Sequence, residues 1–164
     1  MHSTLVLQLL FLLMLANGTP VVAKKILGRR YSYPLDGDLA LADGRPLFGR
    51  SKTIRGVALA VLVTATGASI IGLAWQVGAL VGAFAMVGDL FSSFCKRRFG
   101  LPSSSRASGL DQVPESLLPL LACRNLLALT ITDIAVCVVM FVVGEIVLSR
   151  LLYAVHLRDR PYYY

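Results

Sequence analysis

Asp89 stands out among the polar residues because it lies inside an otherwise apolar stretch, residues 54–94, that holds one other charge. An acid inside a membrane segment is costly to bury and usually has a function. Ser92, Ser93 and Lys96 follow Asp89 by three, four and seven residues. At these spacings one helical face carries a carboxylate, two hydroxyls and an ammonium. A structural Asp–Lys pair that merely tolerates burial is the alternative reading.

Two further acids, Asp111 and Glu115, stand where apolar sequence resumes around Pro114. A carboxylate at this place can cap a helix N-terminus, and proline suits the first helical turn. Capping does not explain why Asp89, Asp111 and Glu115 all collect near basic residues. Hard oxygen ligands beside cations are typical of a site for Mg²⁺ and phosphate.

A glycine-rich basic segment, residues 43–56, lies directly before the long apolar stretch. Glycines let backbone amides approach an anion closely, cations neutralise phosphate, and a helix N-terminus favours negative charge. The segment therefore predicts a polyphosphate ligand. On composition alone, a basic loop that contacts anionic lipid head groups is an equal alternative.

The elements that must position these residues are predicted to be membrane helices. The chain has 164 residues, of which 56% are hydrophobic and 15% charged, whereas soluble domains carry about 25% charged residues. The apolar blocks are residues 5–23, 54–94, 114–129 and 131–152. The second block is long enough to cross a bilayer twice, with a turn near Trp75 and Gln76. The third is short and interrupted by Arg124, so it is a tilted, marginal or re-entrant segment.

The basic residues predict the orientation of these spans, because Lys and Arg accumulate in short cytoplasmic loops. Three of their groups lie in residues 24–55, 96–106 and 150–160. Five spans place all three groups on one side, whereas four would place the C-terminal tail opposite the loops. We therefore predict an all-α polytopic membrane protein with five transmembrane helices, an external N-terminus and a cytoplasmic C-terminus. Residues 1–164 form one membrane-embedded domain with cytoplasmic loops at about 24–53 and 96–113.

The first apolar block, residues 5–23, allows two readings. A cleaved signal peptide is one, but the positive charges Lys24 and Lys25 follow the apolar run instead of preceding it. We therefore expect an uncleaved span, and we expect the Asn17 to Pro20 segment to bend or break its helix in the last third.

Several other polar and small residues receive structural interpretations. His2 and His156 are expected to be solvated, and Asp133 is expected to lie at the outer interface. The three cysteines are read as buried small hydrophobes. The glycines of the middle spans are expected to let helices approach closely: Gly67, Gly72, Gly78 and Gly82. Glu145 is expected to pair with a basic residue, for which Arg150 on its own helix is a candidate.

The order of these motifs resembles the CDP-archaeol synthase family, small membrane enzymes distantly similar to phosphatidate cytidylyltransferases. The matching elements are Asn17-Gly-x-Pro20, Asp43-Gly-Arg, Phe48-Gly, Lys52-Thr-x-Arg-Gly56, Gly88-Asp89-x-x-x-Ser93-Phe-x-Lys96-Arg-Arg98 and Leu110-Asp-Gln112. The resemblance implies five spans and transfer of a cytidylyl group from CTP to a membrane lipid phosphate, with release of pyrophosphate. CTP, the lipid phosphate, the bilayer and Mg²⁺ would be the partners and cofactor, with no nucleic acid, at the cytoplasmic side of the cytoplasmic membrane.

The resemblance also implies roles for individual residues. The predicted metal ligands are Asp89, Asp111 and Glu115, and the predicted catalytic residues are Asp89, Lys96 and Asp111. The predicted substrate-binding residues are Asp43, Gly44, Arg45, Gly49, Lys52, Thr53, Arg55, Gly56, Ser93, Arg97 and Gln112.

One position departs from the wider cytidylyltransferase pattern, which has a second acid where this chain has Pro114. Glu115, one residue later, is a candidate to supply the missing carboxylate. The departure makes a non-catalytic lipid- or nucleotide-binding scaffold an alternative. Another Mg²⁺-dependent transferase of phospholipid synthesis is a separate alternative. The D-G-x-x-A-R pattern of the CDP-alcohol phosphatidyltransferases is not met, because Arg-Pro-Leu-Phe follows Gly44.

Overall fold

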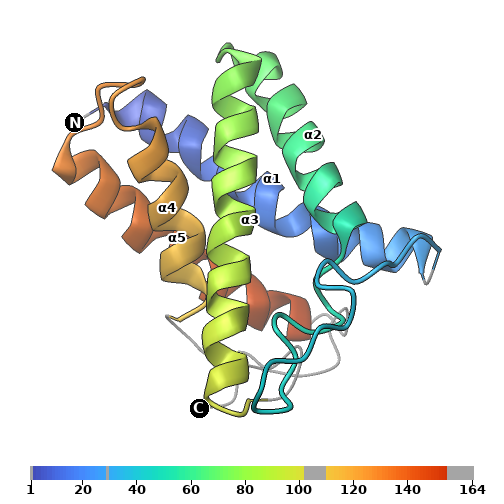
Figure 1. Ribbon diagram of the computed structural model, residues 1–164. Coiled ribbons are helices and arrows are strands. Elements are labelled where there is room, and N and C mark those ends of the chain that lie inside the picture. The colour runs from blue at the N-terminus through green and yellow to red at the C-terminus, as the bar shows by residue number, and fades with distance from the viewer. Residues whose placement is uncertain (1, 29, 102–109, 155–164) are drawn as a thin grey trace.

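The computed structural model describes residues 2–28, 30–101 and 110–154, with side chains described as far as Val147. Its helices are α1 (Ser3–Leu27), α2 (Ile54–Ile70), α3 (Trp75–Arg98), α4 (Gln112–Cys123) and α5 (Ile131–Ala154), as Figure 1 shows. The described chain contains no strand beyond two isolated bridges in the loop after α1. The all-α prediction is therefore confirmed for these residues, and the α2–α3 turn precedes Trp75 as expected.

Two of the described helices, α1 and α3, are long and apolar enough to cross a membrane, and α2 is a shorter apolar helix. Helix α4 has 12 residues, which corresponds to about 18 Å, against a bilayer core of about 30 Å. This length agrees with the prediction of a short segment before the last helix. The number of spans and their orientation stay predictions.

Helix α1 corrects the expectation of a break near Pro20, because it continues through this proline to Leu27. Pro20 removes one backbone N–H but leaves the remaining helical hydrogen bonds in place. The side chains of Asn17 and Thr19 stay within the helix too, since they donate to the carbonyl oxygens of Leu13 and Leu15 at 3.1 and 2.6 Å. In apolar surroundings, a continuous helix is the conformation that satisfies the most backbone groups.

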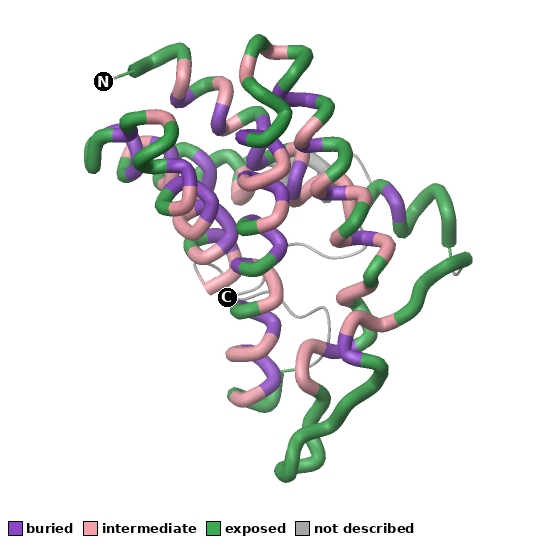
Figure 2. Tube along the Cα trace, turned by 45° about the horizontal axis from the view of Figure 1, so that its top comes forward, coloured by how far each residue is buried: buried purple, intermediate pink, exposed green. Residues whose placement is uncertain are grey.

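The core forms where α1 crosses the other helices, and α1 packs against α2, α3 and α5. Its buried side chains Leu9, Leu12 and Leu13 join apolar residues from α3, α4 and α5 in one cluster. Figure 2 shows buried positions along the inner faces of the helices, while the loop after α1 is mostly exposed. This packing agrees with the reading of α1 as a structural helix of the bundle.

Close helix packing at glycines is confirmed at three of the four predicted positions. A Cβ atom on Gly67 would lie 2.4 Å from the Leu15 side chain, and one on Gly78 would lie 2.3 Å from the Thr64 carbonyl oxygen. A Cβ atom on Gly82 would likewise lie 2.9 Å from the Cα atom of Val61 in α2. Gly72 is the exception, because it lies in the α2–α3 turn with φ of +80°, and a Cβ atom there would have no neighbour within 4 Å. Its role is conformational, since glycine adopts this backbone angle without a steric penalty.

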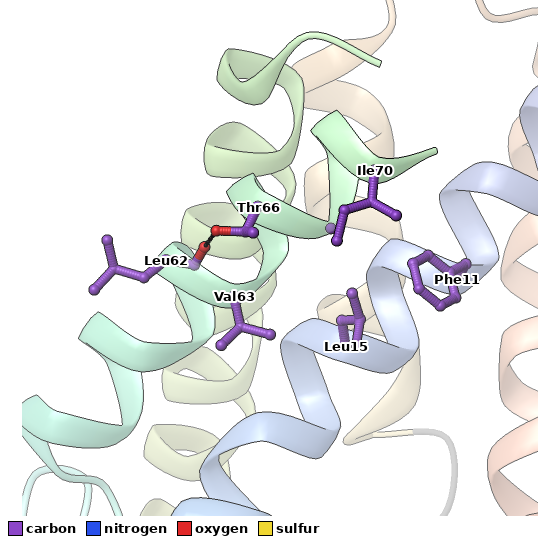
Figure 3. A pocket seen from close by; sticks show the side chains of 7 residues that line it. Phe11, Leu15, Leu62, Val63, Thr66 and Ile70 are labelled. Carbon is purple, nitrogen blue, oxygen red and sulfur yellow. Dashed lines mark hydrogen bonds between the residues drawn. The ribbon is translucent and has the colours of Figure 1, made fainter. Parts of the chain in front are cut away.

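An apolar groove runs between α1 and α2 on the outside of the bundle (Figure 3). It is lined by Phe11, Leu15, Leu62, Val63, Thr66, Gly67 and Ile70. None of these side chains ionises, so this groove offers no acid, base or cation for chemistry.

At the end of the bundle near the N-terminus, Asp133 is buried by the protein and 1% exposed. Its expected position at the outer membrane interface stays a prediction. Its carboxylate accepts hydrogen bonds from the backbone N–H and hydroxyl of Thr130 at 3.1 and 2.7 Å. The backbone N–H of His2 donates to it at 2.9 Å, and the His2 ring lies 3.0 Å away. His2 is half exposed and His156 lies outside the described residues. Asp133 therefore closes the first turn of α5 and ties the start of α1 to it.

The three cysteines are free thiols, and Cys123 and Cys137 are buried. This confirms the interpretation as buried small hydrophobes for these two, whereas Cys95 is partly exposed. The side chain of Arg150, a candidate partner of Glu145, lies outside the described residues.

Candidate functional site

The predicted site residues lie at the end of the bundle where α3 ends and α2 and α4 begin (Figure 1). The loop of residues 28–53 folds back beside this end of α3. An isolated bridge between Pro34 and Thr53 closes the loop at its base. The backbone N–H of Leu35 donates to the carbonyl oxygen of Lys52 at 2.8 Å. These contacts return the chain to the start of α2 and bring Lys52 beside α3.

Lys52 and Asp89 form an ion pair although 37 residues separate them in the sequence. The Lys52 Nζ atom lies 2.5 Å from both carboxylate oxygens of Asp89, and each side chain is 20% exposed. A charge-assisted contact of this kind is stronger than a neutral hydrogen bond. The structure thus joins the glycine-rich loop to the acid of the apolar helix α3, a contact that the sequence alone did not predict.

Glu115 reaches the same carboxylate from α4. The Glu115 and Asp89 carboxyl groups lie close enough to interact electrostatically, and Glu115 is 7% exposed. The approach depends on Gly88, since a Cβ atom there would lie 2.3 Å from the carbonyl oxygen of Pro114. The absence of a side chain at Gly88 therefore lets the backbone of α4 contact α3 at Asp89. Glu115 stands one residue after Pro114, the position where the wider sequence pattern has its second acid, and it lies near Asp89.

The pair of Asp89 and Glu115 fits a divalent cation in the chemistry of its donors. Two neighbouring carboxyl groups need a proton or a positive charge beside them, because two adjacent negative charges repel. Lys52 supplies one such charge in this structure. Carboxylate oxygens are the ligands that Mg²⁺ prefers. Within the described residues, no three His, Cys, Asp or Glu side chains come close enough together to hold a metal ion. The structure thus brings together two of the three predicted ligands, and Asp111 lies apart from them.

Asp111 pairs with Lys96 instead. Their closest atoms, Lys96 Nζ and Asp111 Oδ1, are 2.7 Å apart, and the side chains are 7% and 16% exposed. Asp111 precedes α4, but its side chain forms no capping hydrogen bond, so the capping alternative is wrong in this structure. Ser92 and Ser93 are almost fully buried with Lys96, which confirms that they share the packed face of α3. A second ion pair therefore lies about two turns along α3 from Asp89.

Arg97 and Gln112 belong to the same region and are buried, at 4% and 2% exposed. Both were predicted to bind substrate. Gln112 opens α4 directly after Asp111, and its carbonyl oxygen accepts a hydrogen bond from the Ser116 hydroxyl at 2.7 Å. The two residues are thus placed beside the Lys96–Asp111 pair by the contact between α3 and α4.

Arg45 and Asp43 fasten the loop to the end of α3. The Arg45 guanidinium donates to the carbonyl oxygen of Arg98 at 2.5 Å. The Arg98 guanidinium in turn donates to Asp43 at 2.6 Å and to the carbonyl oxygen of Pro46 at 2.9 Å. The backbone N–H of Arg45 and the Arg98 side chain hold the pKa of Asp43 below its usual value. These two predicted substrate-binding residues therefore stabilise the loop in this structure.

Arg55, Thr53 and Gly56 likewise have structural contacts. The Arg55 guanidinium donates to the carbonyl oxygens of Gly28 and Arg30, just beyond α1. Thr53 is the N-cap of α2, and its hydroxyl accepts a hydrogen bond from the Gly56 N–H at 3.2 Å. The basic segment was expected to bind a polyphosphate, and the structure gives three of its residues a role in joining α1, the loop and α2.

The loop glycines occupy turns that require them. Gly44 and Gly49 have φ of +72° and +90°, where a side chain would be strained. The N–H of Gly49 donates to Asp36 at 3.0 Å. Asp36 is 5% exposed, and sequence reasoning did not select it. The sequence Asp36-Gly37-Asp38 is typical of a turn, and it was the feature from which a structural role of Asp36 could have been predicted.

Comparison with known proteins identifies the family of this chain. The family model described as CarS-like, CDP-archaeol synthase, matches residues 2–162. A CDP-archaeol synthase of Pyrobaculum calidifontis is 38% identical over 65% of this chain and 66% of its own length. One of Saccharolobus islandicus is 36% identical over 60% of this chain and 59% of its own length. The aligned part thus spans less than two thirds of these relatives.

A solved structure extends the similarity to the fold. It is described as an intramembrane enzyme for archaeal membrane lipid biosynthesis, and it is 28% identical to this chain. The match has a TM-score of 0.69 and covers 85% of this chain and 89% of the other. The overall helical arrangement of this chain is therefore similar to that of a known membrane enzyme.

Proposed function

Because this chain belongs to the CDP-archaeol synthase family, we propose that it transfers a cytidylyl group from CTP to a membrane lipid phosphate. An oxygen of the lipid phosphate attacks the α-phosphorus of CTP, the bond from that phosphorus to the bridging oxygen breaks, and pyrophosphate leaves. The observation that supports this proposal most directly is the group formed by Lys52, Asp89 and Glu115. It combines two carboxylates with a cation at the end of an apolar helical bundle.

The chemistry suits these residues, because a lipid phosphate is already an anion at neutral pH and needs no strong general base. Positioning and neutralisation of negative charge then provide most of the catalysis. Lys52 is placed to exchange its carboxylate partner for a phosphate oxygen. Lys96 and Arg97 add positive charge in the last turn of α3, the helix that carries Asp89. The loop of residues 28–53, with its glycine turns, supplies backbone N–H groups that suit a polyphosphate.

Asp89 and Glu115 are the residues that we propose to hold Mg²⁺. The cation would neutralise phosphate charge when it is bound. Glu115 takes the role left open by Pro114, because the Gly88 contact brings its side chain to Asp89. This placement favours an active enzyme over a scaffold that has lost a ligand. We propose that Asp111 positions Lys96 through their ion pair. Asp111 could bind Mg²⁺ only if this ion pair were broken.

The membrane placement follows from the same proposal. Five spans with an external N-terminus put the loop of residues 28–53, the end of α3 and the start of α4 on the cytoplasmic side, where CTP is available. The lipid tails stay beside the apolar helices while the head group reaches the charged site. The family name favours a lipid with ether-linked chains.

The test is an assay of the purified protein with CTP labelled at the α-phosphate, Mg²⁺ and a panel of lipid phosphates. The panel contains phosphatidic acid and ether-linked isoprenoid phosphates. We expect a labelled CDP-lipid and one pyrophosphate per transfer, with the ether lipid preferred, and loss of both products when EDTA is added. Binding of CTP without pyrophosphate release from any lipid would contradict the proposal and support the scaffold.

A further inference from the structure

Asp36 lies at the centre of the loop between α1 and α2, and its carboxylate is almost completely surrounded by protein. It is 5% exposed. One oxygen accepts hydrogen bonds from the backbone N–H groups of Phe48 and Gly49 at 2.9 and 3.0 Å. The other accepts from the N–H of Asp38 at 3.2 Å. Burial favours the neutral acid, but the backbone N–H groups outweigh it and lower the pKa of Asp36, so the group is charged at neutral pH.

The N–H groups that Asp36 binds belong to the turn that carries Lys52. The Lys52 N–H donates to the carbonyl oxygen of Gly49 at 3.1 Å, and the Lys52 carbonyl oxygen accepts from the N–H of Leu35 at 2.8 Å. Leu35 directly precedes Asp36. Asp36 therefore holds both sides of the short segment from which the Lys52 side chain extends to Asp89.

Backbone contacts at the base of the loop also hold this segment, but the other side-chain contacts of the loop either are exposed or lie away from this turn. Asp38 and Arg50 form an ion pair at 2.9 Å, but their side chains are 50% and 82% exposed. Exposed pairs of this kind contribute little. Asp43, Arg45 and Arg98 fasten the far end of the loop to α3. Asp36 is the buried acid of this loop whose contacts lead directly to the Lys52 backbone.

We infer that Asp36 is a positioning residue, which acts through the turn at Gly49 to hold Lys52 in the site. This inference rests on the proposed function for its catalytic consequence. Its structural content is independent of that function, because the position of the Lys52 amine can be measured without turnover. Asp36 itself touches no reacting atom.

The experiment measures the chemical labelling of lysine amines with acetic anhydride in the purified full-length protein, read residue by residue by mass spectrometry. The variants are Asp36→Asn and Asp36→Ala, and Asp38→Asn is the matched control. Asp38 has φ of +62°, a conformation that asparagine tolerates well. Lys96 is the internal reference, because it is held by Asp111 and does not depend on the loop.

We expect the Lys52 labelling rate to rise about tenfold in Asp36→Ala and by a smaller factor in Asp36→Asn, which keeps one acceptor oxygen. Lys96 labelling and the Asp38→Asn control should stay at the wild-type rate. In the cytidylyl-transfer assay, both Asp36 variants should lower kcat/KM for CTP by about 10- to 100-fold. The lipid KM should stay close to the wild-type value.

An unchanged Lys52 rate in both Asp36 variants would overturn the inference. An equal rise at Lys96 would also overturn it, because it would indicate general loosening of the bundle. If Lys52 alone becomes reactive but the wild type transfers no cytidylyl group, the positioning role holds and the proposed function fails. The two failures are therefore distinguishable in one set of samples.

Discussion

Asp89 and Asp133 are acids on apolar helices at opposite ends of this bundle, and their partners differ in kind. The two oxygens of Asp133 receive N–H and hydroxyl donors from Thr130 and His2. Asp89 instead shares its surroundings with a second acid, Glu115, and with Lys52. A buried carboxylate whose oxygens all accept hydrogen bonds stabilises the fold and requires no bound ion or ligand to satisfy it. An acid placed near another acid needs a proton or a positive charge beside it, and Lys52 supplies such a charge in this structure. Burial by itself therefore does not identify a functional acid.

The largest expected effect comes from neutralising Asp89. Asp89→Asn should reduce cytidylyl transfer by at least about 100-fold, because an amide is a poor ligand for Mg²⁺ and a poor partner for Lys52. The helical CD spectrum and insertion into membranes should stay unchanged. The matched control is Asp133→Asn, which should keep transfer. Near-normal turnover in Asp89→Asn would contradict the metal assignment.

Gly88→Ala tests whether the two acids need the close contact between α3 and α4. The added Cβ would lie 2.3 Å from the Pro114 carbonyl oxygen, so the helices must separate. We expect a loss of about 1–3 kcal/mol in the free energy of unfolding and at least about tenfold in turnover.

Gly144→Ala in α5 is the control for this change, because nothing lies within 4 Å of the added Cβ. It should leave turnover unchanged, and helix propensity favours alanine. Equal effects at Gly88 and Gly144 would contradict the importance of the α3–α4 contact.

Asp133→Asn should reverse the pattern seen at Asp89, with a loss of stability and no loss of turnover. The asparagine side chain has one acceptor oxygen where four donors converge, so the thermal midpoint should fall by about 3–8 °C. Thr130→Ala removes part of the same cap and should shift the midpoint in the same direction. A loss of turnover at unchanged stability would place Asp133 among the functional acids.

The smallest effect is expected at the exposed pair of Asp38 and Arg50. Arg50→Ala should leave both the thermal midpoint and turnover at wild-type values, because water solvates the two side chains about as well as they solvate each other. A clear loss of CTP binding in this variant would instead assign Arg50 to the nucleotide site.

Much of the helical arrangement and part of the site follow from local features of the sequence. The turn before Trp75, the short helix after Asp111 and the shared face of Asp89, Ser93 and Lys96 all follow from apolar runs and helical spacing. The expected break at Pro20 was wrong, because α1 continues through this residue in surroundings that favour a continuous helix. The roles of Arg45 and Arg55 were not predictable either, because a basic residue near glycines has the same sequence pattern whether it binds phosphate or a carbonyl oxygen.

By itself, the sequence determined which residues could do chemistry, because an acid in an apolar run and a glycine-rich basic segment are unusual enough to recognise. Only the tertiary structure decided which of them meet. Lys52 reaches Asp89 and Glu115 across long separations in the chain, and Asp111 turns to Lys96. These choices depend on where Gly88 lets two helices touch and on how Asp36 folds the loop. Both are contacts between residues distant in sequence, which helical spacing does not encode.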